Sequence, residues 1–215
     1  MINLTDDNIY KELELLPPDF QGFNKANSNF FDELISKIKP KTIMEIGSWK
    51  GASAFTMCKS IKKNKLNTKI FCIDTWLGAI EFIDKTRGWL TNENFIKERN
   101  LVKKNGYPQV YYQFLSNVVH SENQDIIIPF PNTSLIASRY FKHNGIKADL
   151  VYIDGSHDYF DVYHDILNYS ELLLENGLIF GDDYHWADVK KAVIDFASLK
   201  NKKIEIYENN FWVLK

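Results

Sequence analysis

Three aspartates follow two apolar segments in the second half of the chain, where strands of a sheet are expected to end. Asp154 closes the segment 149–154 (DLVYID), and Asp182 and Asp183 follow 178–180. Neighbouring parallel strands lie about 4.8 Å apart, so these carboxylates are expected to converge. Close carboxylates repel one another unless a cation lies between them, and hard oxygen ligands suit Mg²⁺, Mn²⁺ or Ca²⁺ better than zinc. We therefore predict a divalent metal site at Asp154, Asp182 and Asp183; the alternative is that one or two of them cap the following helices.

His157 stands three residues after Asp154, at the mouth of the same predicted site. Because a histidine titrates near neutral pH, His157 is a candidate general base, with Asp154 beside it as a second reactive group. A purely structural role for this histidine is an equal alternative. His164 and His185 are weaker candidates, since one falls on a predicted helix and the other follows the acidic pair.

A glycine-containing loop follows the first predicted strand, with the sequence EIGSWKGAS over residues 45–53. Gly47 and Gly51 let the backbone turn tightly and let a ligand approach the exposed N–H groups of the next helix. A plain strand-to-helix turn explains this pattern about as well. The dinucleotide fingerprint G-x-G-x-x-G is absent, which argues against a nicotinamide cofactor.

Asp74 ends the second predicted strand, 27 residues after Gly47. An acidic residue at this position accepts hydrogen bonds from both hydroxyls of a ribose in nucleotide-binding folds. Taken alone, Asp74 is better explained as a cap for the next segment. The glycine loop and Asp74 together predict a nucleoside-binding site.

These residues need a scaffold of alternating strands and helices, and the hydrophobic pattern supplies one. The predicted strands are 42–46, 69–74, 124–130, 149–154 and 178–180, followed by a closing hairpin of 203–207 and 211–214. The predicted helices are a leader helix ended by Pro40, then 51–63, a helix through His143 capped by Asn132, 159–174 with a C-cap at Asn176-Gly177, and 187–199. The stretch 76–107 is expected to be mostly helical and polar.

This alternation predicts an α/β fold with a seven-stranded, mostly parallel sheet, helices on both faces and a C-terminal antiparallel hairpin. With 215 residues, the chain is long enough for one sizeable core and short for two. We therefore expect a single domain over 1–215, with a helical leader over 1–39 and the core over 40–215.

The composition excludes several classes of protein. A net charge of −2 gives no electrostatic reason to expect a nucleic-acid partner. The apolar runs are far too short to span a bilayer, and the acidic N-terminus does not resemble a signal peptide. Cys58 and Cys72 are expected to be buried thiols, so we predict a cytoplasmic protein in a reducing compartment.

The four motifs together resemble a known family. EIGSWKGAS, FCIDTW, VYIDGSHDY with a downstream Asp165, and GLIFGDDY occur in the order found in class I S-adenosylmethionine-dependent methyltransferases. The resemblance covers about residues 40–200 and is strongest to the group of macrocin-type sugar O-methyltransferases and cephalosporin hydroxylase-like methyltransferases. It implies a Rossmann-like fold that binds S-adenosylmethionine, with metal use similar to that of catechol O-methyltransferase.

The resemblance also implies a role for each matching residue. The cofactor would be bound by residues of the glycine loop, of the end of the second strand, of the loop near the adenine and of the end of the fourth strand. These residues are Glu45, Gly47, Ser48, Gly51, Ser53, Asp74, Ser134 and Asp154. Asp154, Asp182 and Asp183 match the metal ligands of the family, with Mg²⁺ as the expected ion. His157 matches the position of the base in the sugar-modifying members.

The expected reaction is metal-assisted O-methylation of a small hydroxylated acceptor, such as a sugar or a phenol. Aromatic residues of the 76–112 stretch (Trp76, Phe82, Trp89 and Phe95) would cover the acceptor, or else belong to the core. Two alternatives remain open, namely a non-catalytic nucleoside-binding module of the same fold and an NAD-linked oxidoreductase. Nitrogen as the methylated atom and a homo-oligomeric assembly also remain open, whereas neither a nucleic acid nor a membrane is expected as a partner.

Overall fold

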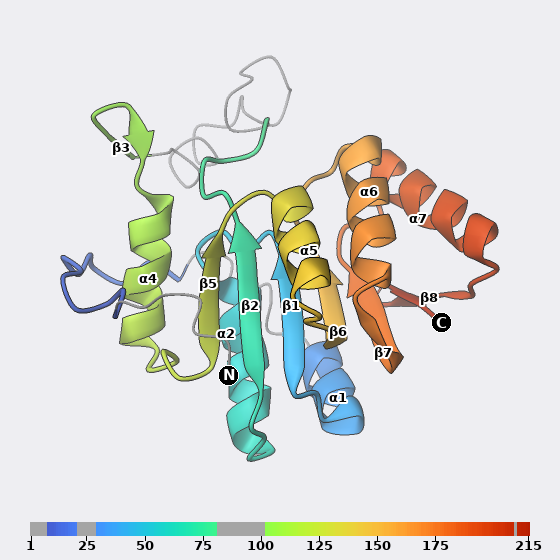
Figure 1. Cartoon of the computed structure of the whole chain (residues 1–215), viewed down its shortest axis with the longest axis horizontal. Helices are drawn as coiled ribbons and strands as arrows, with labels where there is room; N and C mark the ends of the chain where they lie inside the picture. Colours follow the sequence, from blue (N-terminus) through green and yellow to red (C-terminus); the bar gives the residue numbers. More distant parts are fainter. Residues whose placement is uncertain (1–7, 21–28, 81–101, 209) are drawn as a thin grey trace.

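Seven strands form one mixed sheet in the computed structural model, which describes residues 8–20, 29–80, 102–208 and 210–215. The strand order is β5-β2-β1-β6-β7-β9-β8 (Figure 1). Pairing is parallel from β5 to β7 and antiparallel around β9. The strands are β1 (Thr42–Ile46), β2 (Lys69–Asp74), β5 (Ile127–Pro131), β6 (Ala148–Ile153), β7 (Leu173–Gly181), β8 (Ile204–Tyr207) and β9 (Phe211–Leu214). The predicted fold class is therefore confirmed.

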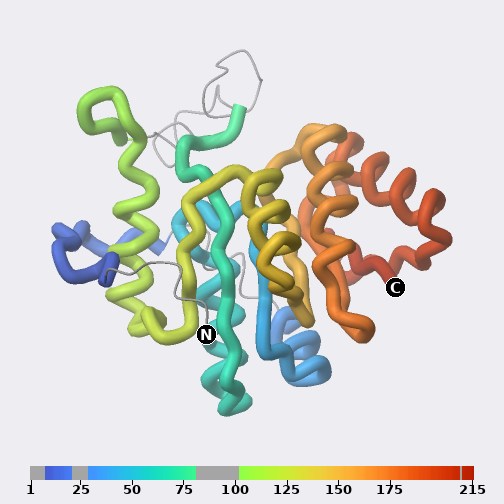
Figure 2. The backbone as a smooth tube through the Cα atoms, viewed as in Figure 1, coloured from blue at the N-terminus to red at the C-terminus, as the bar shows by residue number. Residues whose placement is uncertain are grey.

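Helices cover both faces of this sheet, with α5 and α6 in front of it and α2 behind it in the view of Figures 1 and 2. Three helices pack in the core on one face: α1 (Asn29–Ile38), α2 (Ala52–Lys63) and α4 (Val110–His120). Three others pack on the opposite face: α5 (Ser134–His143), α6 (Tyr159–Ser170) and α7 (Ala187–Lys200). Both faces of the central strands are consequently removed from water, which explains their nearly continuous apolar sequences.

Side chains of the central strands alternate between the two halves of the core. In β1, Ile43 packs on the α2 side, whereas Met44 and Ile46 pack on the α5 and α6 side. Glu45 occupies a position equivalent to that of Ile43 and is fully buried. A charged residue at such a position needs polar partners, and these are described with the site below.

Part of the stretch predicted to be helical has a different structure. Residues Lys103–Lys104 (β3) and Tyr107–Pro108 (β4) form a small antiparallel pair that leads into α4, a helix that the sequence did not predict. Trp76 is 1% exposed and packs against Tyr111 and Phe114, each with ring centroids 4.9 Å away. The core alternative is thus confirmed for Trp76. Phe82, Trp89 and Phe95 lie outside the described residues.

Several predicted boundaries were wrong, among them those of the strand predicted over 178–180, which is β7 and extends over Leu173–Gly181. Thr133, not Asn132, caps α5, since its hydroxyl accepts the N–H of Ile136 at 3.2 Å. Helix α6 ends at Ser170, and the predicted cap Asn176-Gly177 lies inside β7, which pairs with β6 from Leu173 onward. Strand β5 begins at residue 127 and ends at 131, where its prolines are tolerated because it is an edge strand.

Two other expectations concern burial and the membrane. Cys58 and Cys72 are both buried free thiols, as predicted, and burial raises the pKa of each. Within the described parts of the chain, no helix has the length and apolar character needed to cross a membrane.

Candidate functional site

The loops that follow β1 and β6 touch each other at the carboxyl edge of the sheet. Gly47 has a φ of +87°, and a β-carbon added to it would lie 2.2 Å from the carbonyl oxygen of Asp154. Only glycine permits both this backbone conformation and this close approach. Gly51 caps α2 with a φ of +94°, and a β-carbon there would overlap the ring of Phe55. The two glycines therefore place the loop 47–51 directly beside the end of β6.

Glu45 is hydrogen-bonded to this loop and to the first turn of α2. Its buried carboxylate accepts hydrogen bonds from the hydroxyls of Ser48 and Ser53, both at 2.5 Å. Burial raises the pKa of Glu45, while the two hydroxyls oppose that shift. The sequence predicts contacts between all three residues and a cofactor; in the structure, their hydrogen bonds run to one another and fix the shape of the loop.

Asp74 binds the same loop from the side of β2. Its carboxylate accepts the backbone N–H of Trp49 at 2.8 Å and that of Trp76 at 2.7 Å. The indole N–H of Trp76 then donates to the carbonyl of Trp49 at 2.7 Å. Burial raises the pKa of Asp74, and these backbone donors counter it. Asp74 therefore lies where a nucleoside-binding carboxylate is expected, already joined to the glycine loop.

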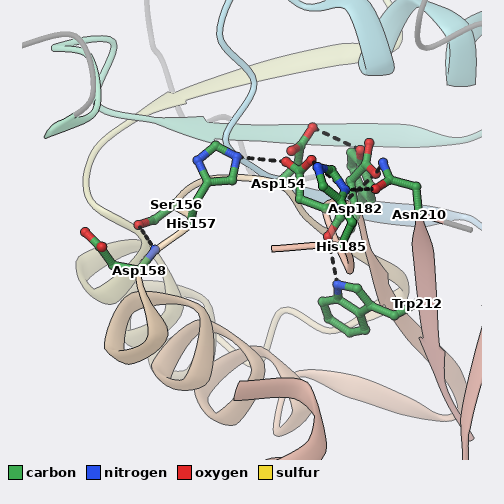
Figure 3. Close-up of polar contacts among 10 residues, drawn as sticks. Asp154, Ser156, His157, Asp158, Asp182, His185, Asn210 and Trp212 are labelled. Atoms are coloured by element: carbon green, nitrogen blue, oxygen red, sulfur yellow. Dashed lines mark hydrogen bonds and ion pairs between the residues drawn. The ribbon is translucent and has the colours of Figure 1, made fainter. Parts of the chain in front are cut away.

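Asp154 and Asp182 directly follow the adjacent strands β6 and β7 and lie near each other (Figure 3). The hydroxyl of Tyr152 donates to Asp154 at 3.0 Å, and the side-chain amide of Asn210 donates to Asp182. Burial raises the pKa of Asp154 well above its usual range, and the carboxylates of Asp182 and Asp183 raise it further. Burial and the neighbouring Asp183 raise the pKa of Asp182 to about 6. The three carboxylates are thus close enough to repel one another.

His157 lies beside the third carboxylate of this group. Its Nε2 lies 2.8 Å from Oδ2 of Asp183, and its ring stacks on Trp186 with a centroid separation of 4.8 Å. Asp183 reaches this position with a left-handed φ of +59°. His185 lies 3.9 Å from Oδ1 of Asp183 and binds Asn210 instead. Of the candidate histidines, His157 is therefore the one held in the acidic group.

The remaining predicted residue, Ser134, opens α5 beyond the end of β5. Its carbonyl accepts the hydroxyl of Tyr169 at 2.9 Å, and its side chain hydrogen-bonds the buried carboxylate of Asp165. Burial raises the pKa of Asp165 to about 7. His164, on the same helix as Asp165, is exposed and binds the carbonyl of Phe160.

A small pocket opens among the acidic residues. It combines four polar residues with four apolar ones, namely Asp154, Ser156, Asp182, Asp183, Ile153, Val162, Val189 and Trp212. The described residues contain no group of three or more His, Cys, Asp or Glu side chains arranged to hold a metal ion. Each carboxylate instead has a protein partner: Tyr152 for Asp154, Asn210 for Asp182 and His157 for Asp183.

Several residues of the site were missed by the sequence analysis. Tyr152 orients Asp154, and Trp186 orients His157. In the sequence, neither aromatic residue differs from others in predicted strands and loops. Asn210 reaches Asp182 from the turn between β8 and β9, and Trp212 donates its indole N–H to the carbonyl of Asp182 at 3.0 Å. No local signal marks these residues, because they belong to a strand and a turn that pair with β7 only in the folded sheet.

Comparison with known proteins identifies the family. A family model described as a methyltransferase domain matches residues 44–184, well over half of the chain. The chain belongs to this methyltransferase family. The matched range begins in β1 and ends just after Asp183, so it contains the glycine loop, Asp74 and the acidic group. The predicted methyltransferase is confirmed.

Solved structures with the same fold include O-methyltransferases. The methyltransferase resembles an O-methyltransferase from Bacillus cereus solved with SAH (S-adenosylhomocysteine), with a TM-score of 0.56, 12% identity, and coverage of 94% of this chain and 93% of the other. NovP, an O-methyltransferase, gives 0.60 at 14% identity, with 90% and 78% coverage. CalS11, a calicheamicin methyltransferase, gives 0.59 at 14% identity, with 90% and 77% coverage. At these identities the likeness establishes the Rossmann-like methyltransferase fold.

One curated relative is also similar. An uncharacterized protein, y4gI, from Sinorhizobium fredii (strain NBRC 101917 / NGR234) is 24% identical to the methyltransferase over 150 residues, or 70% of this chain. This match spans only 14% of the length of y4gI.

Proposed function

We propose that this methyltransferase transfers the methyl group of S-adenosylmethionine to a hydroxyl oxygen of a small acceptor, such as a sugar or a phenol. The pairing of His157 with Asp183 at 2.8 Å carries the proposal, because it places an oriented base beside Asp154 and the glycine loop. The fold neighbours support it. The Bacillus cereus enzyme was solved with SAH, TomG with S-adenosylmethionine, and CalS11 is a TDP-rhamnose 3′-O-methyltransferase.

The cofactor half of the site would be the loop 47–51 together with Asp74. Asp74 ends β2 beside this loop, and its carboxylate would accept hydrogen bonds from the ribose hydroxyls as well as from the backbone of the loop. The loop leads into the N-terminus of α2. The first N–H groups of a helix have no partner within the helix, so they favour a negative charge such as the methionine carboxylate of S-adenosylmethionine. When bound, S-adenosylmethionine supplies an electrophilic methyl group on a sulfonium sulfur.

The acceptor half would be formed around His157. Methyl transfer is an in-line displacement, in which an O–CH₃ bond forms as the S–CH₃ bond breaks, so the acceptor oxygen must be held opposite the sulfur. A protonated hydroxyl is a weak nucleophile, and a base that takes its proton speeds the reaction. In the neutral tautomer that donates Nε2–H to Asp183, the basic lone pair of His157 would lie on Nδ1. The products are the methyl ether, SAH and a proton on His157.

Metal assistance is the second part of the proposal. Asp154, Asp182 and Asp183 are hard oxygen donors at one edge of the sheet, and burial together with the neighbouring carboxylates raises the pKa of Asp154 and Asp182. These residues would hold Mg²⁺, which would lower the pKa of the acceptor hydroxyl. Calorimetric titration with Mg²⁺ tests this directly: Asp182→Asn should lose the binding, whereas the exposed Asp188→Asn control should keep it. Equal binding by both variants would refute the metal site.

The main proposal is tested by titrating the protein with SAH and with NAD, then incubating it with S-adenosylmethionine and a panel of sugars and phenols. We expect SAH to bind, NAD not to bind, and mass spectrometry to show a methylated acceptor. Binding of SAH without turnover of any hydroxylated or amine acceptor would favour the non-catalytic module. Binding of NAD in place of SAH would favour an oxidoreductase.

A further inference from the structure

A buried asparagine joins three separate segments of the chain behind the glycine loop. Asn117, on α4, has no exposed surface. Its Oδ1 accepts the backbone N–H of Asp19 at 3.0 Å, and its Nδ2 donates to the carbonyl of Asp19 at 2.7 Å. The same Nδ2 donates to the carbonyl of Lys50 at 2.9 Å. One side chain therefore binds the N-terminal leader and the loop 47–51 at once.

The leader segment 16–20 is held along α4 by further contacts. The N–H of Leu16 donates to the hydroxyl of Ser116 at 3.0 Å, and the carbonyl of Leu16 contacts Nε2 of His120 at 2.8 Å. Gln113 donates to the carbonyl of Pro17 at 2.9 Å. In Figure 1 the leader, in dark blue, runs beside α4. Residues 113, 116, 117 and 120, spaced along about two turns on one side of this helix, thus contact a segment that lies about 100 residues earlier in the chain.

The leader also contacts the glycine loop and its helix directly. Nζ of Lys50 lies 2.6 Å from a carboxylate oxygen of Asp19, and the Lys50 side chain is only 13% exposed. The ring of Phe20 meets that of Phe55, on α2, edge to face at 5.7 Å. Lys50 precedes Gly51, the residue that caps α2 and ends the loop. The carbonyl of Lys50 is therefore bound by Asn117 of α4, and its ammonium group is bound by Asp19 of the leader.

We propose that Asn117 is a positioning residue that couples docking of leader segment 16–20 to the binding of S-adenosylmethionine. This inference rests on the proposed function, since it assigns the loop 47–51 to the cofactor. The conformation of the loop decides where its N–H groups point, and Asn117 fixes the carbonyl immediately before Gly51. Loss of the side chain would remove one hydrogen-bond partner from the part-buried backbone groups of Asp19 and Lys50. Because coupling is reciprocal, the cofactor must stabilise the docked leader as much as the leader favours the cofactor.

The first test needs no substitution. Hydrogen exchange of the native chain is measured with and without saturating SAH, at the amides of Leu16 and Asp19. We expect both to exchange more slowly with SAH, because each N–H donates to α4 only when the leader is docked. Unchanged exchange at both amides, together with protection of the loop 47–51, would overturn the coupling.

The second test compares substitutions of two hydrogen-bonded asparagines, the buried Asn117 and the half-buried Asn64. Asn117→Ala should weaken SAH binding about tenfold or more, because it removes the hydrogen bonds that join the loop 47–51 to the leader. Asn64→Ala is the matched control, because Asn64 caps the other end of α2 and joins it to Ser36 of α1. We expect this control to lower the unfolding midpoint without changing the SAH dissociation constant. Equal SAH affinity in Asn117→Ala and the native chain would overturn the inference.

The outcomes separate the inference from the function on which it rests. If the native chain does not bind SAH, the proposed function fails and this inference fails with it. If the native chain binds SAH but Asn117→Ala binds it equally well, the function stands and the inference alone is refuted. If Asn117→Ala does not fold, the hydrogen exchange of Leu16 and Asp19 in the native chain tests the inference. Slower exchange with SAH supports it, and unchanged exchange refutes it.

Discussion

Nε2 of His157 lies 2.8 Å from Oδ2 of Asp183, although the two residues follow different strands. The register of the sheet explains the pairing. Ile153 of β6 is paired with Gly181 of β7, so His157 and Asp183 leave the same edge only a few residues beyond a shared position. The stacking of Trp186 on the imidazole adds a second contact that limits rotation of the ring. This arrangement predicts how substitution of either residue changes the rate of methyl transfer.

His157→Ala should reduce methyl transfer by about 10² to 10⁴, the usual contribution of a positioned base. Asp183→Asn should cause a smaller loss, because an amide no longer selects the tautomer with its lone pair on Nδ1. The initial rate of SAH formation with a working acceptor measures both. SAH affinity should stay within about twofold of the native value, since both side chains are assigned to the acceptor half of the site and not to the cofactor half. A native rate in His157→Ala would remove this residue from the role of base.

Asp74→Ala should weaken SAH binding and also lower stability. The substitution removes the acceptor of two N–H groups, those of Trp49 and Trp76, each costing about 1–3 kcal/mol when left buried without a partner. Asp74→Asn keeps one acceptor oxygen and should lie between the native protein and the alanine variant. Calorimetry with SAH and urea unfolding measure the two effects. Tight SAH binding in a folded Asp74→Ala protein would exclude Asp74 from the cofactor site.

Gly47→Ala should destabilise the fold by more than about 3 kcal/mol, because the new β-carbon would lie 2.2 Å from the carbonyl oxygen of Asp154 at a φ of +87°. Gly145→Ala provides the comparison. Gly145 also has a positive φ, of +64°, but an added β-carbon there meets nothing within 4 Å. Its substitution should therefore cost only about 1 kcal/mol of backbone strain. Similar urea midpoints for the two variants would contradict the contact between the loop and β6.

Asp165 predicts a pH dependence of stability. Burial raises its pKa in the folded protein to about 7, whereas an aspartate in the unfolded chain titrates near 3.9. The folded state holds the proton more tightly, so this residue contributes stability at low pH that is lost as the pH rises towards 7. Asp165→Asn should remove that dependence and raise the unfolding free energy at pH 8 by as much as about 4 kcal/mol, at 1.36 kcal/mol per pKa unit.

Urea unfolding at pH 5 and pH 8 checks this prediction. The gain from Asp165→Asn should be larger at pH 8 than at pH 5. Asp188→Asn, on the exposed surface of α7, should stay within about 0.5 kcal/mol of the native protein at both values. An equal effect of Asp165→Asn at the two pH values would show that the carboxyl does not titrate between them.

The sequence alone was sufficient to predict the sheet and most of its helices. Runs such as 69–74 and 149–154 are apolar throughout because both faces of a central parallel strand are buried, and that requirement is visible locally. Helix α4 was missed since its sequence, VYYQFLSNVVH, is rich in residues that also favour strands. The end of α6 was misplaced because pairing of Leu173 with Ala148 of β6 outweighs the cap signal of Asn176-Gly177.

For the site, the sequence determined which residues stand at the strand ends. Glycines 47 and 51, Asp74, Asp154, His157, Asp182 and Asp183 follow from the alternation of elements, since the carboxyl ends of parallel strands share one edge. Only the tertiary structure decided what each side chain binds. Asp183 binds His157, Asp74 binds the backbone of the glycine loop, and Asn117 joins that loop to the leader. These contacts connect segments up to about 100 residues apart, and their geometry arises from packing between elements, which no local pattern of residues encodes.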